Sequence, residues 1–115
     1  KLEDLVKPLH PAFDPQAQAS VQNLANAGKI GAGTNVNLSV DVSYTPVKKG
    51  NKFVPQVTTV VTGEPEVIRK AVQAVASKFN TEISNKISGV LSQEWEKGTQ
   101  PNPGKFNFRQ LNFSL

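Results

Sequence analysis

The sequence predicts an α+β domain, in which one apolar face of an antiparallel β-sheet is covered by a long helix. Two periodicities support this prediction. Between Asn35 and Tyr44 apolar and polar residues alternate strictly, which is the pattern of a half-buried strand. Between residues 65 and 97 apolar residues recur every three or four positions, which is the pattern of an amphipathic helix. The chain has 115 residues, the size of one domain, so we expect residues 1–115 to fold as a single unit.

A β-hairpin is predicted over residues 36–62. Its second run, Phe53 to Thr62, is rich in β-branched residues, and residues 45–52 between the two runs carry the Pro and Gly signals of a turn. Pro46 and Pro55 lack the amide hydrogen that a sheet ladder needs. We therefore expect both prolines at strand ends, edges or bulges.

The long helix is predicted over residues 65–97, because Glu64-Pro65-Glu66 suits a helix N-terminus and Lys97-Gly98 suits a C-terminus. Unbroken, it would be about 50 Å long, whereas a domain of this size is about 30 Å across. We expect it both to bend or break near Asn80-Thr81 or Ser88-Gly89 and to pack part of its second half on another copy of the chain. The apolar stripe would then form the interface of an intertwined dimer, with the residues Val72, Phe79, Ile83, Ile87, Leu91 and Trp95.

The N-terminal region is predicted to be partly helical. Residues 1–13 resemble a packed arm with one helical turn at most, ended by Pro8 and Pro11. Asp14-Pro15 has the pattern of an N-cap followed by a first-turn proline and predicts a short helix over 15–27. The many Gln, Asn and Ser residues there leave a strand as the alternative.

Residues 105–115 predict the final strand. Phe106 and Phe108 alternate in one phase, and Leu111, Phe113 and Leu115 alternate in the other. A β-bulge near Arg109-Gln110 would turn all five toward one side, and without the bulge the strand would be buried on both faces.

The composition argues against an enzyme. The chain has no Cys, which excludes thiolate metal sites, disulfides and a cysteine nucleophile. His10 is the only histidine; we expect it on the surface of the N-terminal arm, where it can support neither a metal cluster nor a catalytic triad. We expect no cofactor and no metal, although an enzyme that uses carboxylates remains an alternative. No apolar run approaches the roughly 18 residues that suggest a membrane span.

The formal net charge of +4 arises from the segments predicted as strands. Residues 64–100 carry five basic and five acidic residues, whereas residues 31–63 carry three and one and residues 101–115 carry two and none. Amide and hydroxyl groups can hydrogen-bond bases, riboses and phosphates, while Lys and Arg attract phosphates. The predicted nucleic-acid surface comprises Asn35, Asn37, Ser39, Ser43, Lys48, Lys49, Lys52, Lys105 and Arg109. The competing interpretation is an ordinary solvated sheet face, and Asp41 within the polar row favours it.

The segment VVTGEPEVIRKAVQAV (60–75), which follows a polar-faced hairpin with a basic turn, resembles the coat proteins of small single-stranded-RNA bacteriophages. The resemblance covers about half of the chain. It implies an antiparallel sheet followed by helices that clasp the sheet of a second subunit, RNA bound on the exposed sheet face, and dimers assembled into a shell. It would make Val60–Thr62 the last strand before the helices and Glu66–Phe79 the clasping helix.

Two functional hypotheses follow from these patterns. The first is a non-enzymatic, self-assembling structural protein, a coat subunit of a virion that contacts RNA through the polar sheet face. The second is a secreted or periplasmic binding or adaptor module, in which Phe106, Phe108 and Phe113 enclose an apolar ligand or a partner helix. Rising salt weakens nucleic-acid binding steeply but does not weaken apolar binding, so salt dependence separates the two hypotheses.

Overall fold

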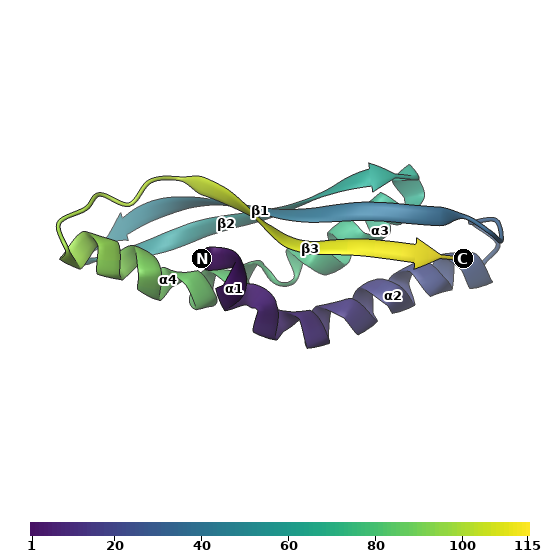
Figure 1. Ribbon diagram of the computed structural model, residues 1–115, viewed down its shortest axis with the longest axis horizontal. Coiled ribbons are helices and arrows are strands. Elements are labelled where there is room, and N and C mark those ends of the chain that lie inside the picture. Colours follow the sequence, from purple (N-terminus) through teal and green to yellow (C-terminus); the bar gives the residue numbers. More distant parts are fainter.

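The computed structural model describes residues 1–115 as one antiparallel sheet of three strands with helical segments along one side (Figure 1). The strand order is β2-β1-β3, so β1 is central and the other two strands form the edges. The predicted α+β class is confirmed. In chain order the elements are α1 (Leu2–Val6), the 3₁₀ turn η1 (Lys7–Leu9), α2 (His10–Asn26), β1 (Asn35–Lys49), β2 (Lys52–Glu64), α3 (Glu66–Ser77), α4 (Asn80–Glu96) and β3 (Gly104–Ser114).

The hairpin of β1 and β2 is longer than predicted, because its turn contains only Gly50 and Asn51. Gly50 has a φ of 63°, which suits the first central position of a type II′ turn. Pro46 lies directly opposite Pro55, beyond the last pair that β1 makes with β3. Pro55 lies in the edge strand β2. The expectation of edge positions for both prolines is confirmed, because each lies where its strand has a neighbour on one side only.

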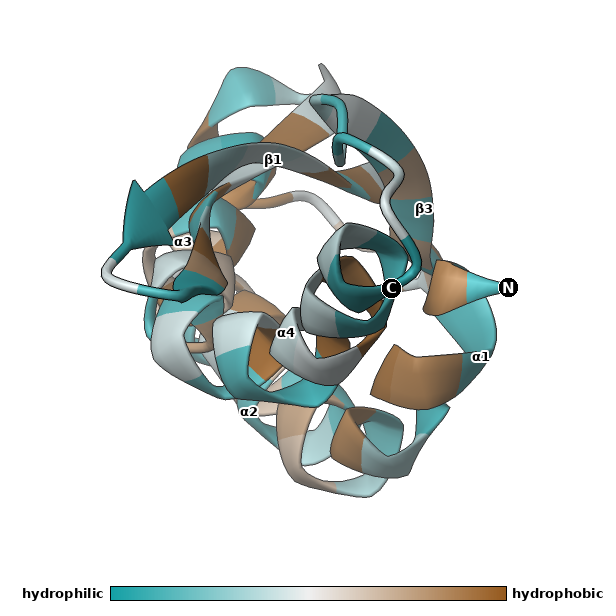
Figure 2. Ribbon diagram, turned by 90° about the vertical axis from the view of Figure 1, so that its left-hand side faces the viewer, coloured by the Kyte–Doolittle hydropathy of each residue, from teal (hydrophilic) through white to brown (hydrophobic).

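The sheet buries only one of its faces. Val36, Leu38, Val40 and Val42 of β1 are each at most 1% exposed, whereas alternate residues of the strand, such as Asn35, lie at the surface. Figure 2, which looks along the molecule, shows the helices gathered on the buried side of the sheet. The strict alternation in the sequence therefore reports a sheet covered on one face and free on the other.

Helices α3 and α4 follow β2 along the length of the molecule (Figure 1). The predicted helix is broken at Lys78 and Phe79, next to the expected Asn80-Thr81 position, while Ser88 and Gly89 lie within the continuous α4. The expectation of a domain about 30 Å across is wrong, because the molecule measures 54 × 21 × 21 Å and accommodates both helices end to end.

The apolar stripe of these helices belongs to the chain's own core. Five of the six residues predicted as a dimer interface are at most 3% exposed: Val72, Phe79, Ile83, Ile87 and Leu91. The sixth, Trp95, is half-buried and packs edge-on against Phe53 with the ring centroids 5.1 Å apart. The prediction of a dimer interface at these positions is therefore wrong in this fold, because a second copy cannot reach side chains buried within the first.

The N-terminal region is helical almost throughout, and the expectation that Pro8 and Pro11 end a single helical turn is wrong. Each proline occupies the first turn of its own segment, η1 or α2, where the missing amide hydrogen has no helical partner. The predicted helix over 15–27 is present, but it begins at His10, so Pro15 lies inside it and Asp14 is not its N-cap.

An aromatic cluster of Phe13, Phe79 and Phe108 lies where three interruptions of the secondary structure meet. Phe13 contacts Phe108 and Phe79 edge-on, with ring centroids 5.1 and 5.4 Å apart. Phe79 occupies the break between α3 and α4. Phe108 is the extra residue of a β-bulge, since Val40 pairs with Arg109 but the next residue of β1 pairs with Asn107.

The bulge confirms the prediction for β3, one residue earlier than expected. Phe108 and Leu111 are buried, and three further residues of the last segment pack against the core: Phe106, Phe113 and Leu115. The extra residue therefore brings both phases of the strand to the covered side.

Tyr44 marks the covered side near the end where β3 begins. It is half-buried and packs against Phe106 with ring centroids 6.1 Å apart. Burial raises the pKa of the Tyr44 phenol above its ordinary 10.0, and the negative charge of Glu94 raises this pKa further.

We predict that Phe13→Ala lowers the free energy of unfolding by about 3–5 kcal/mol, because it empties the centre of the aromatic cluster. Urea denaturation measures the change. The matched control is Val67→Ala, which truncates a side chain that is 40% exposed on α3 and should change stability by less than about 0.5 kcal/mol. Equal losses in the two variants would show that the cluster is not a centre of stability.

We predict that the phenol of Tyr44 ionises above pH 10.0 in the native protein. Its absorbance is readable directly because Tyr44 is the only tyrosine of the chain. Since the folded state holds the proton more tightly, the contribution of this group to stability is complete below the unfolded pKa and falls as the pH rises through the folded pKa. In denaturant the midpoint should return to its ordinary value. A native midpoint at or below that value would contradict the burial of Tyr44.

Candidate nucleic-acid interface

The uncovered face of the sheet is the candidate site. Residues that lie directly opposite in the ladder share a face, so the strand register places Thr58 and Thr62 of β2 beside Ser43 and Ser39 of β1. The register with β3 adds Lys105 beside Ser43 and Asn112 beside Asn37. The polar residues of this outward face are Asn35, Asn37, Ser39, Asp41, Ser43, Thr45, Lys49, Lys52, Gln56, Thr58, Thr62, Glu64, Lys105, Asn107, Gln110, Asn112 and Ser114.

A hydrogen-bond network organises the centre of the outward face. The side-chain amide of Asn107 donates to Asp41 Oδ1 and to Ser39 Oγ, both at 3.0 Å. The Gln110 amide also donates to Ser39 Oγ at 3.1 Å, and this hydroxyl makes a longer contact of 3.4 Å with Asp41. Asp41, whose negative charge favours the interpretation as an ordinary solvated face, is therefore already hydrogen-bonded within the sheet.

Three lysines supply positive charge to the outward face. Lys49 and Lys52 lie opposite each other beside the hairpin turn, and Lys105 lies opposite Ser43 near the start of β3. All three are exposed, and none of them takes part in an ion pair. Their ammonium groups are free to meet an anionic ligand.

Lys48 lies on the covered side of the sheet, so its predicted place on the outward face is wrong. Its neighbours Val47 and Lys49 take the opposite phase of β1. The Lys48 ammonium is 4.8 Å from the ring centroid of Trp95 on α4, within the range of a cation–π contact. This lysine therefore holds the hairpin against the helix layer.

The predicted place of Arg109 on the outward face is also wrong, because the bulge at Phe108 changes the phase of β3. It pairs with the buried Val40 and turns toward α2. There its Nε and Nη2 donate to the two carboxylate oxygens of Asp14, at 3.0 and 2.6 Å. These hydrogen bonds raise the pKa of the guanidinium above its ordinary value. Arg109 thus connects β3 to α2 and is not free to bind phosphate.

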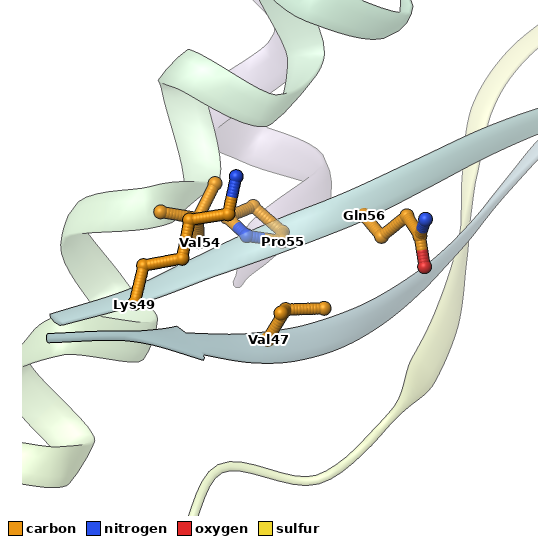
Figure 3. Close-up of a pocket in the computed structure, with 5 residues that line it drawn as sticks. All are labelled: Val47, Lys49, Val54, Pro55 and Gln56. Carbon is orange, nitrogen blue, oxygen red and sulfur yellow. The ribbon is translucent and has the colours of Figure 1, made fainter.

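A shallow pocket adjoins the lysines at the hairpin end of the sheet (Figure 3). Its walls are Val47, Lys49, Val54, Pro55 and Gln56. Val54 is 37% exposed, and Val60 further along the same face is 44% exposed, so apolar surface interrupts this mostly polar face at two places. A nucleobase or a ribose ring could rest on the valines while Lys49 reaches a neighbouring phosphate.

The residues considered for catalysis or for an apolar ligand have structural roles. His10 is half-buried, and its Nε2 donates to the carbonyl oxygen of Phe108 at 2.6 Å, so the expectation of a free surface histidine is wrong. Phe106, Phe108 and Phe113 pack into or against the core, where they fill space that an enclosed ligand would need. No three His, Asp or Glu side chains are close enough together to hold a metal ion. None of the helices has both the length and the apolar character needed to cross a membrane.

Of the outward residues of β2 and β3, only Lys52 and Lys105 are predicted from the sequence. In β2 both phases contain β-branched residues, so Thr58 and Thr62 could not be assigned to a face from the pattern alone. In β3 the phase depends on the exact position of the bulge, which separates Asn107 from Gln110. Pairing with the clear alternation of β1 is the signal that places both strands.

No protein-family model, no curated protein and no solved structure matches this chain, so the assignment of the site depends on the geometry described above.

Proposed function

We propose that the protein is a non-enzymatic, self-assembling structural protein that binds single-stranded RNA across the outward face of its sheet, as a coat subunit of a virion does. The observation that carries this proposal is the one-sided sheet. One face is sealed by helices, while the other carries amides and hydroxyls along its length and three unpaired lysines in the half nearer the hairpin turn.

The side chains of this face match the chemistry of an RNA strand. Asn and Gln amides and Ser and Thr hydroxyls both donate and accept hydrogen bonds, as do the ribose 2′-hydroxyl and the base edges. The ammonium groups of Lys49, Lys52 and Lys105 favour phosphates and make the binding sensitive to salt. A single strand suits the surface better than a duplex, because its unstacked bases can lie against an open sheet.

The distribution of charge supports the same face. The cations of the covered side are engaged, since Arg109 is paired with Asp14 and Lys48 lies over Trp95. The network of Asn107, Ser39 and Asp41 fixes the orientation of the polar groups before a ligand arrives, which lowers the entropy cost of binding.

We predict that replacing Lys49, Lys52 and Lys105 by Gln weakens RNA binding and reduces its salt dependence. Fluorescence anisotropy with a labelled oligouridine, measured over a range of salt concentrations, should show the logarithmic salt slope falling by about 0.7 for each lysine removed. A control that replaces Lys70, Lys78 and Lys86 of the helix layer by Gln removes the same charge and should leave the slope nearly unchanged.

A second comparison uses two cations of one strand. Lys105→Gln should weaken the binding of the oligouridine, whereas Arg109→Gln should leave it nearly unchanged because Asp14 already engages that guanidinium. If the outward-face and helix-layer lysine variants lost equal RNA affinity, the binding would depend on the overall charge of the protein and not on the outward face. An absence of binding at low salt would overturn the proposed function.

A further inference from the structure

The rest of the chain covers one edge of the sheet, that of β2, and leaves part of the other edge, that of β3, uncovered. At the edge of β2, Gln73 of α3 takes the place of a neighbouring strand. Its side-chain carbonyl accepts from the Val61 amide at 2.8 Å, and its amide donates to the Thr59 carbonyl at 2.9 Å. These contacts also show that the odd-numbered residues of β2 direct their backbone groups away from β1.

The helix layer covers the same edge further along. Ser84 of α4 donates to the carbonyl oxygen of Pro55 at 3.0 Å, and Ser92 contacts the carbonyl oxygen of Phe53 at 3.4 Å. Pro55 itself offers no amide hydrogen at this edge. The edge of β2 is thus occupied by side chains and proline, which prevents another strand from pairing with it.

The edge of β3 has no such cover between Gln110 and Ser114. Leu115 donates its amide to the Thr34 carbonyl at 3.0 Å, and its carbonyl accepts from Gly33, so the odd-numbered residues at this end of β3 face β1. The backbone groups of Gln110, Asn112 and Ser114 therefore point away from the sheet. No strand lies beside them, and all three residues are exposed.

We propose that this open edge pairs with the same edge of a second copy of the chain, antiparallel and across a two-fold axis at Asn112. Such a pairing would form about six backbone hydrogen bonds from the residues that now lack partners. This edge would be the interface through which the protein of the proposed function assembles. The inference rests on the self-assembly in that proposal but does not depend on RNA binding.

A second copy fits this edge because the edge is complementary to itself. The two-fold axis places Gln110 opposite the partner's Ser114 on the outward face, where amide and hydroxyl can hydrogen-bond. On the covered side it places Leu111 opposite the partner's Phe113, which is only partly buried in the single chain. No charged residue lies between Gln110 and Ser114, so no like charges are brought together.

The closed edge of β2 limits the growth of the sheet, through strand pairing, to two chains. With one edge paired and the other occupied by Gln73, Ser84 and Ser92, the sheet of the dimer ends on both sides and a filament cannot grow. The dimer would present one continuous polar face made of the outward faces of both copies.

The first test is the mass of the intact protein by light scattering, combined with amide hydrogen exchange. We expect twice the chain mass of 12.4 kDa, with the amides of Gln110, Asn112 and Ser114 protected from exchange and losing that protection on dilution. A monomer at high concentration, or a dimer in which these three amides exchange freely, would overturn the proposal.

The second test places a charge at the two-fold axis. Asn112→Lys sets two lysines opposite each other and should return the protein to the mass of one chain, while the circular dichroism spectrum stays native because this side chain points to solvent. The matched control is Thr58→Lys, which puts the same charge on the outward face of β2 and should leave the mass doubled. If both variants or neither dissociated the dimer, the β3 edge would not be its interface.

These measurements separate the two proposals. A monomer that binds the oligouridine would refute the β3 interface and leave the RNA face standing. A dimer with protected edge amides that binds no RNA would refute the RNA face alone.

Discussion

The contact among Phe13, Phe79 and Phe108 is the interaction on which the arrangement of this protein depends. It joins the beginning of α2, the break between α3 and α4, and the bulge of β3 at one point of the core. Each interruption is costly in isolation, because a broken helix and a bulged ladder both leave backbone groups to be satisfied. Aromatic burial at their meeting point offsets that cost and holds α2, α3 and α4 on the same side of the sheet.

One-sided coverage then determines how the rest of the surface is used. The helix layer seals the inner face and, through Gln73, Ser84 and Ser92, the edge of β2. The outward face and the edge of β3 stay free; amides and hydroxyls line both, and the outward face adds three lysines. The proposed RNA surface and the proposed dimer edge are thus consequences of the same asymmetry.

The sequence predicts those parts of the fold that follow from local periodicity. The alternation of β1, the two phases of β3 and the apolar stripe of α3 and α4 are strong signals, and the hairpin, the bulge and the broken helix follow from them. Shape is not a local property. Length alone suggested that the helix was too long for one domain, yet the molecule is 54 Å long and buries the stripe within itself.

The errors at Pro8, Pro11 and Arg109 have one cause, which is tertiary packing. Pro8 and Pro11 resemble helix breakers but lie in the first turns of new helical segments, which the fully buried Val6 and Phe13 on either side hold against the core. Arg109 resembles a phosphate ligand, but the bulge at Phe108 turns it toward Asp14. The outward row of β1 could be predicted, whereas the neighbours that complete the site become visible only with the register.

Amide chemical-shift mapping of the isotope-labelled protein with unlabelled oligouridine at low salt would locate the RNA surface. We predict that the shifts concentrate on the outward face of the three strands, around Asn37, Ser43 and Lys105, and that they reverse when salt is added. Shifts confined to α2, α3 and α4, or the absence of any shift at low salt, would contradict the proposed RNA surface.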